Sequence, residues 1–123
     1  MYKYFTFLEL IKTQQDSRNL PTTLDQVENL LLLAQLLEQI REDYGLPIIV
    51  NSAFRDPIVN SKVGGAPNSY HLHGRAADIR PDYFPARDYS WNFQRLVDVI
   101  KNYKDELVEF IVDPSEKYIH IAI

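Results

Sequence analysis

One long amphipathic segment constrains the fold of this chain more than any other feature. Thr23 to Gln26 has the pattern of a capping box, in which the threonine hydroxyl serves a free backbone N–H and the glutamine side chain reaches back. Gly45 and Pro47 end the segment. Between these signals apolar residues recur at helical spacing: Val27, Leu30, Leu31, Ala34, Leu37, Ile40 and Tyr44. The pattern predicts a long helix that is the main structural support.

Shorter patterns on either side of this helix predict a small sheet. Residues 1–22 form a lead-in, and residues 53–73 are rich in turn signals and are predicted to be a loop. A second helix is expected over residues 90–104, where apolar residues share one face. Strands are expected at residues 47–52, 76–79, 108–112 and 118–123, the last two forming a hairpin. We therefore expect an α+β fold, with a small antiparallel sheet packed with two main helices, in a single domain over residues 1–123.

Composition excludes several classes of protein. The chain has 123 residues and no cysteine, so disulfides are impossible and a metal site has to use histidine and carboxylate ligands. The formal net charge is −4, without a basic cluster, and this argues against nucleic-acid binding. No apolar run approaches the roughly 20 residues of a membrane span, and the first residues lack a signal peptide pattern. We expect a monomer that is synthesised in the cytoplasm.

Three histidines and one aspartate are the candidates for chemistry. His71 and Asp78 are separated by small residues that let the backbone bend, and His120 lies within the predicted last strand. Catalytic zinc takes three such ligands and keeps one position for water. Taken alone, these residues also fit packed or exposed histidines without a metal.

A resemblance to a known family gives these residues a role. Ser69, His71, Gly74, Ala76 and Asp78 match the SxHxxGxAxD pattern of the D-Ala-D-Ala metallopeptidase family, which belongs to a wider zinc group with lysostaphin-type endopeptidases and the hedgehog domain. The chain is most similar to small members from phages and prophages. Further segments resemble the family in the same order: residues 3–10, 29–30, 40–48, 51–57, 63–69 and 118–121.

The resemblance implies a zinc ion held by His71, Asp78 and His120. His73 falls at a variable family position and is expected to be a surface imidazole or to support a ligand. A rival geometry, in which an extended segment lets His71 and His73 share the metal, stays open.

The resemblance also implies roles for residues around the metal. Arg55 is expected to hold the substrate carbonyl or carboxylate as charge develops, although a structural ion pair is the alternative. Ser52 and Ser69 are expected to orient ligands or the loop backbone, although Ser69 is equally suited to a plain turn. Tyr70 fits either a position lining the cleft or packing on the sheet.

A general base is needed to take the proton of the attacking water. Lys117 stands where related enzymes often have a glutamate, and an ungapped comparison with the phage-type members predicts Asp113 as the base. Glu116 and Glu109 are the competing candidates, and Glu109 also fits a solvent-facing charge. Ala122 stands where many relatives have serine or aspartate, which removes a potential partner for His120.

The function implied is a zinc-dependent peptidase that hydrolyses peptide bonds of bacterial peptidoglycan, as a D-Ala-D-Ala carboxypeptidase or a cross-link endopeptidase. It would act on the cell wall after release, as a phage lysis enzyme or a virion-associated one does. The alternative is a catalytically inactive zinc-containing module that binds peptidoglycan or a protein. A third reading is a phage structural protein without a metal.

Overall fold

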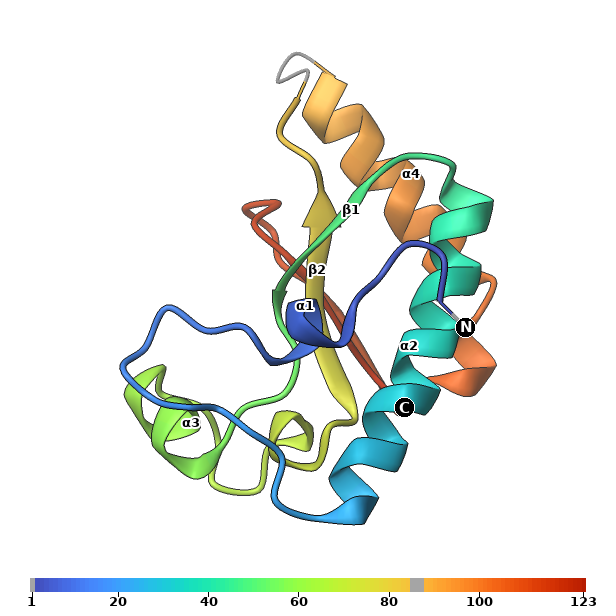
Figure 1. Cartoon of the computed structure of the whole chain (residues 1–123). Coiled ribbons are helices and arrows are strands. Elements are labelled where there is room, and N and C mark those ends of the chain that lie inside the picture. The colour runs from blue at the N-terminus through green and yellow to red at the C-terminus, as the bar shows by residue number, and fades with distance from the viewer. Residues whose placement is uncertain (1, 85–87) are drawn as a thin grey trace.

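The structure, a computed structural model, describes residues 2–84 and 88–123. Within these residues four strands form one antiparallel sheet in the order β1-β2-β4-β3, and α2 and α4 lie on the same side of it (Figure 1). The predicted α+β class is confirmed. The elements are α1 (Phe7–Ile11), α2 (Leu24–Tyr44), β1 (Ile48–Ser52), α3 (Pro57–Lys62), the 3₁₀ helix η1 (Tyr70–His73), β2 (Ala76–Pro81), α4 (Tyr89–Lys101), the 3₁₀ helix η3 (Lys104–Glu106), β3 (Glu109–Val112) and β4 (Ile119–Ala122).

Helix α2 begins and ends where its sequence signals predict. Both bonds of the capping box form, because the Thr23 hydroxyl accepts from the Gln26 N–H and the Gln26 side chain accepts from the Thr23 N–H. At the other end Gly45 adopts a left-handed φ of 84° and donates its N–H to the Arg41 carbonyl. Nowhere in the described ranges does a helix combine the length and apolar character needed to cross a bilayer.

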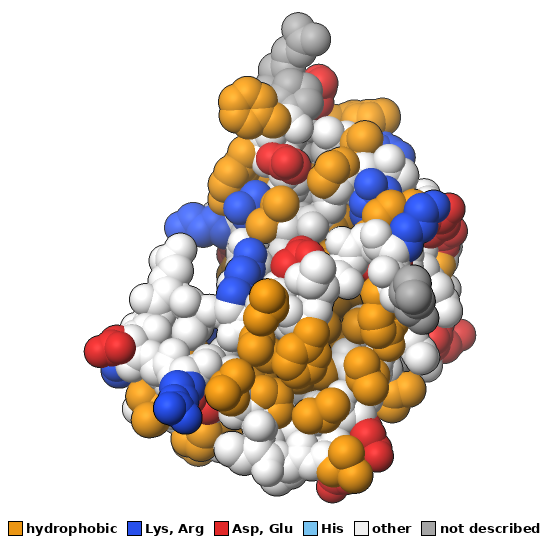
Figure 2. All heavy atoms as spheres, in the orientation of Figure 1, with side chains coloured by type: hydrophobic (Ala, Val, Ile, Leu, Met, Phe, Trp, Pro, Cys, Tyr) orange, Lys and Arg blue, Asp and Glu red, His pale blue; other side chains and the backbone are white. Residues whose placement is uncertain are grey.

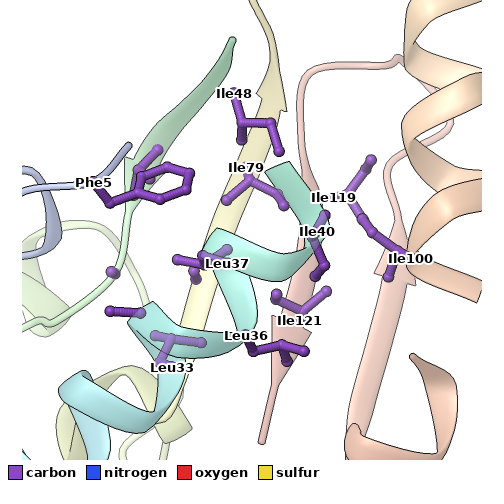
Figure 3. Close-up of a cluster of buried hydrophobic side chains, with 14 of the residues drawn as sticks. Phe5, Leu33, Leu36, Leu37, Ile40, Ile48, Ile79, Ile100, Ile119 and Ile121 are labelled. Atoms are coloured by element: carbon purple, nitrogen blue, oxygen red, sulfur yellow. The ribbon is translucent and has the colours of Figure 1, made fainter. Parts of the chain in front are cut away.

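The core lies between α2 and the sheet. Figure 3 shows Leu33, Leu37 and Ile40 of α2 close to Ile79 and Ile121 of the strands, and all five are fully buried. Burying one such side chain contributes about 1.5–3 kcal/mol. The predicted helix face was only partly right, because Leu31 is 41% exposed whereas Leu33 and Leu36 are buried. The helix contacts the lead-in and α4 as well as the sheet, so its buried arc is broader than the predicted stripe.

The predicted loop over residues 53–73 contains two short helices. Asp56 caps α3 by accepting from the Val59 N–H at 2.8 Å, and a proline follows at the first helical position. The buried Asn19 fixes this segment to the lead-in. Its amide donates to the carbonyls of Ile11 at 2.7 Å and Phe54 at 2.9 Å, and its carbonyl oxygen accepts from the Asp56 N–H at 2.7 Å.

Gly74 ends η1 with a φ of +71° and lies directly against α2. A Cβ at this position would lie 2.6 Å from the Gln26 carbonyl oxygen and 2.9 Å from Leu30 Cγ. Gly64 has a similar φ of +73°, but no atom lies within 4 Å of its added Cβ. The pair therefore separates the cost of a left-handed conformation from the cost of a steric clash.

We predict that Gly64→Ala lowers the free energy of unfolding by about 1 kcal/mol, the cost of an L-residue in the left-handed region. Gly74→Ala adds the displacement of α2 and should cost about 2–4 kcal/mol. Urea unfolding of both variants measures the difference. Equal losses would mean that η1 does not pack against α2 as described.

A second prediction concerns the pH dependence of the hydrogen bonds that the Asp56 carboxylate accepts from the lead-in and from α3. Burial alone would raise the pKa of Asp56, but hydrogen bonds from the Ser17 hydroxyl and from backbone N–H groups, including that of Val59, outweigh it and lower the pKa. A carboxylate with a folded pKa below its unfolded value contributes stability above the unfolded pKa, and this contribution is lost as the pH falls through the folded pKa.

We expect Asp56→Asn to be less stable than the wild type at pH 7, and the gap to narrow at about pH 3, where the wild-type carboxylate takes up protons. Unfolding in urea at both pH values measures the gap. Asp16→Asn, at an exposed position of the lead-in, is the control and should show no such trend. A gap that does not depend on pH would contradict the proposed role of the charge.

Candidate metal centre

The three predicted ligands come from three different elements. His71 lies in η1, Asp78 in β2 and His120 in β4. Asp78 and His120 are directly paired in the antiparallel register of β2 and β4, so the sheet itself brings them together. The turn from η1 into β2 through Gly74 returns His71 to the same place.

The atoms that could bind a metal lie close enough to share one ion. Oδ1 of Asp78 is 3.4 Å from Nε2 of His71 and 2.8 Å from Nδ1 of His120. Among the described residues these three form the group whose ligand atoms lie within 4.8 Å of one another. Ligands about 2.0–2.1 Å from a tetrahedral zinc ion are roughly 3.3 Å apart, so the spacing and the donor set both fit zinc.

His71 is held in one orientation by the backbone around it. Its ring is buried, and Nδ1 lies 2.6 Å from the Ala53 carbonyl oxygen, which can only accept. Nδ1 therefore carries a proton, and Nε2 is the ring nitrogen that faces Asp78. The Ser69 hydroxyl accepts from the His71 N–H at 3.1 Å, a contact that fits both a serine that orients this segment and a plain turn residue.

The charges in the centre favour a cation between the ligands. Burial alone would raise the pKa of Asp78, but hydrogen bonds from His120 and His71 outweigh it and hold the pKa well below its usual range. Burial would lower the pKa of His120, but hydrogen bonds to Asp78 and Glu109 raise it. In the metal-free protein the His120 imidazole thus tends to keep an extra proton, which a bound metal ion has to displace.

Arg55 lies in the wall of the same cleft, held on three sides. Nε donates to the Ser52 hydroxyl at 3.1 Å and Nη2 to Oδ2 of Asp78 at 3.3 Å. Nη1 lies 3.5 Å from Oδ1 of the buried Asn60, a partner that the sequence analysis did not identify. Ser52 therefore acts on the arginine rather than on a metal ligand.

Of the three candidates for the base, the structure brings only Glu109 into the cleft. Glu109 Oε1 lies 2.7 Å from Nε2 of His120. Asp113 lies in the turn between β3 and β4, where its carboxylate accepts from the Lys117 N–H at 3.1 Å, and it does not line the cleft. Glu116 accepts from the Ser90 hydroxyl at 2.5 Å, away from the metal centre.

Strand register explains why Glu109 reaches the site. Ile111 is paired with His120, and Glu109 is paired with Ala122. Side chains two residues apart on a strand share a face, so Glu109 and His120 lie diagonally on the same face of the hairpin. Ala122 is fully buried, and His120 obtains its partners from Glu109 and Asp78 instead.

The cleft over this centre has a volume of about 560 Å³, within the usual range for small-ligand sites. Tyr70 and the exposed His73 line it, but His73 does not belong to the group of possible ligands. Figure 2 shows the face of the molecule on which apolar side chains gather, and no histidine is visible on that face. The rival geometry with His71 and His73 on one metal ion is not what the structure has.

Comparison with known proteins agrees with this arrangement. The family model for Peptidase M15 matches residues 3–122. A zinc D-Ala-D-Ala carboxypeptidase from Streptomyces albus G is 39% identical over 77 residues, which cover 61% of this chain and 30% of that protein. The matched part is thus less than a third of the relative's length. The family match extends over almost the whole chain, and the chain belongs to the peptidase M15 family.

Proposed function

We propose that this chain is a zinc-dependent peptidase that hydrolyses peptide bonds of bacterial peptidoglycan, with the D-Ala-D-Ala carboxypeptidase or cross-link endopeptidase specificity expected from the sequence. The observation that carries the proposal is the convergence of His71, Asp78 and His120 beside a carboxylate in an open cleft. Family membership and the name of the carboxypeptidase relative support it. A monomeric state, a phage origin and action on the wall after release stay predictions.

The proposed zinc ligands are His71 Nε2, Asp78 Oδ1 and His120 Nδ1. Zinc held there supplies an acidified water and polarises the scissile carbonyl. The protein contributes the orientation of the ligands, because the Ala53 carbonyl fixes one imidazole and Glu109 accepts from the other.

We propose Glu109 as the general base in place of Asp113. Its carboxylate borders the cleft that contains the metal centre, and neither Asp113 nor Glu116 does so. In this role Glu109 takes a proton from the attacking water and passes it to the leaving amine. Arg55 donates hydrogen bonds to the substrate oxygen on which negative charge develops.

We predict that two histidines of the cleft, His120 and His73, differ in their effect on zinc binding. Wild-type protein should hold about one equivalent of zinc, as a site with three protein ligands does. His120→Ala should lose the metal, because two remaining ligands hold zinc weakly, whereas His73→Ala should keep it. Elemental analysis after dialysis measures both. Zinc lost from His73→Ala and kept by His120→Ala would show that the ligand set is wrong.

Hydrolysis tests the function and the base together. Zinc-loaded wild type should release new amino groups from purified peptidoglycan, and a chelator should stop the release. Glu109→Gln should keep zinc but lower kcat by about 10²–10⁴-fold, the usual contribution of a general base. Asp113→Asn is the matched control and should retain kcat.

Two outcomes would contradict this assignment. Loss of turnover in Asp113→Asn with normal turnover in Glu109→Gln would show that Asp113, in the turn between β3 and β4, is the general base. Tight binding of peptidoglycan by the zinc-loaded wild type without release of amines would favour the inactive binding module.

A further inference from the structure

The ionised side chains that line the cleft are not all neutralised by one another. Arg55 forms an ion pair with Asp78, and Glu109 accepts from His120. Arg75 also lines the cleft, yet within residues 2–84 and 88–123 no carboxylate forms an ion pair with it. The cleft therefore presents one guanidinium without a protein anion.

Arg75 is held in place although no acidic side chain in the described part of the chain pairs with it. Its guanidinium lies 4.9 Å from the centroid of the Tyr70 ring, and its side chain is half-buried. Its backbone N–H donates to the Tyr70 carbonyl at 3.1 Å, and its carbonyl accepts from the Ile123 N–H at 2.9 Å. Stacking on an aromatic face leaves the N–H groups at the edge of a guanidinium free to donate.

The position of Arg75 suits the end of a short peptide. It lies three residues before Asp78, about 10 Å along an extended chain. The arginine side chain covers part of that distance. A peptide whose scissile carbonyl lies at the metal centre carries its terminal carboxylate about one residue length, up to roughly 3.6 Å of chain, beyond the cleaved bond.

We infer that Arg75, supported by the Tyr70 ring, binds the C-terminal carboxylate of the residue that is released. A planar guanidinium pairs with a carboxylate through two parallel hydrogen bonds, which makes it selective for this group. The inference rests on the proposed function and refines it. A site that binds the terminal carboxylate selects peptides with a free C-terminus, the substrates of a carboxypeptidase, over the cross-links that an endopeptidase cuts. Arg75 is then a specificity residue, distinct from Arg55, whose donors already serve Asp78, Ser52 and Asn60.

The test compares two acetylated Lys-D-Ala-D-Ala tripeptides, one with a free C-terminal carboxylate and one with a C-terminal amide. Binding is measured by calorimetry on the zinc-loaded Glu109→Gln protein, so that hydrolysis does not consume the peptide, and KM and kcat are measured on the wild type. The free acid should bind about tenfold or more tightly than the amide, as expected for a charge-assisted hydrogen-bonded pair.

Arg75→Gln should remove this preference by weakening the acid alone, with a rise in KM rather than a fall in kcat. Tyr70→Phe should keep the preference, and Tyr70→Leu should reduce it because the guanidinium loses its support. Arg41→Gln is the matched control, since Arg41 also stacks on a tyrosine, Tyr4, at 4.2 Å, but does not line the cleft.

The outcomes separate this inference from the proposed function. Equal binding of the acid and the amide by the zinc-loaded Glu109→Gln protein overturns the inference, even when the wild type hydrolyses the peptide. An acid preference that survives the added substitution Arg75→Gln does so as well. An acid preference that depends on Arg75 supports the inference, and it does so even when the wild type hydrolyses neither peptide, in which case the proposed function fails alone.

Discussion

The Asp78 carboxylate is the contact on which the geometry of the site depends. Its Oδ1 faces both His71 and His120, and its Oδ2 accepts from Arg55, so one side chain joins η1, β4 and the segment after β1. A carboxylate with so little exposure is costly unless its oxygens are paired, and here both are. Nδ1 and Nε2 of His120 lie within hydrogen-bonding distance of Asp78 and Glu109. Oδ1 of Asp78 and the two ring nitrogens that face it are the ligands that we propose for zinc.

Local signals in the sequence predicted most of the fold. The capping box at Thr23, the left-handed Gly45 and the apolar spacing between them defined α2, because each acts within one or two turns of helix. The resemblance of the spaced pattern that ends at Asp78, and of the last strand, to a known family implied His71, Asp78 and His120 as ligands, and the structure brings these three residues together. The missed helix α3 had a readable signal, since Asp56 followed by a proline is a typical helix start.

What the sequence did not reveal depends on register and on long-range contacts. Glu109 was ranked below Asp113 because an ungapped comparison fixes a position along the chain but not the pairing of β3 with β4. A shift of one residue in that pairing would have turned Glu109 away from His120. The hydrogen bonds of Asn19 could not be predicted from the sequence either, because its partners are separated from it by up to 37 residues. Such contacts become visible only when the segments are placed in space.

The residues proposed to bind the metal and the residues proposed to select the substrate lie in differently packed parts of the site. The proposed ligands on β2 and β4 lie opposite each other in a backbone ladder, and Ala76 and Ala77 beside them are fully buried, so that this part tolerates little change. Tyr70 begins η1 and Arg75 directly precedes β2, and a backbone hydrogen bond joins the two residues at this corner, where their side chains are only half-buried. With the role inferred for Arg75, substitutions at this corner would alter which peptide end is accepted without moving a proposed ligand. The proposed metal centre would then stay constant in this fold while residues nearby in the chain set the substrate preference.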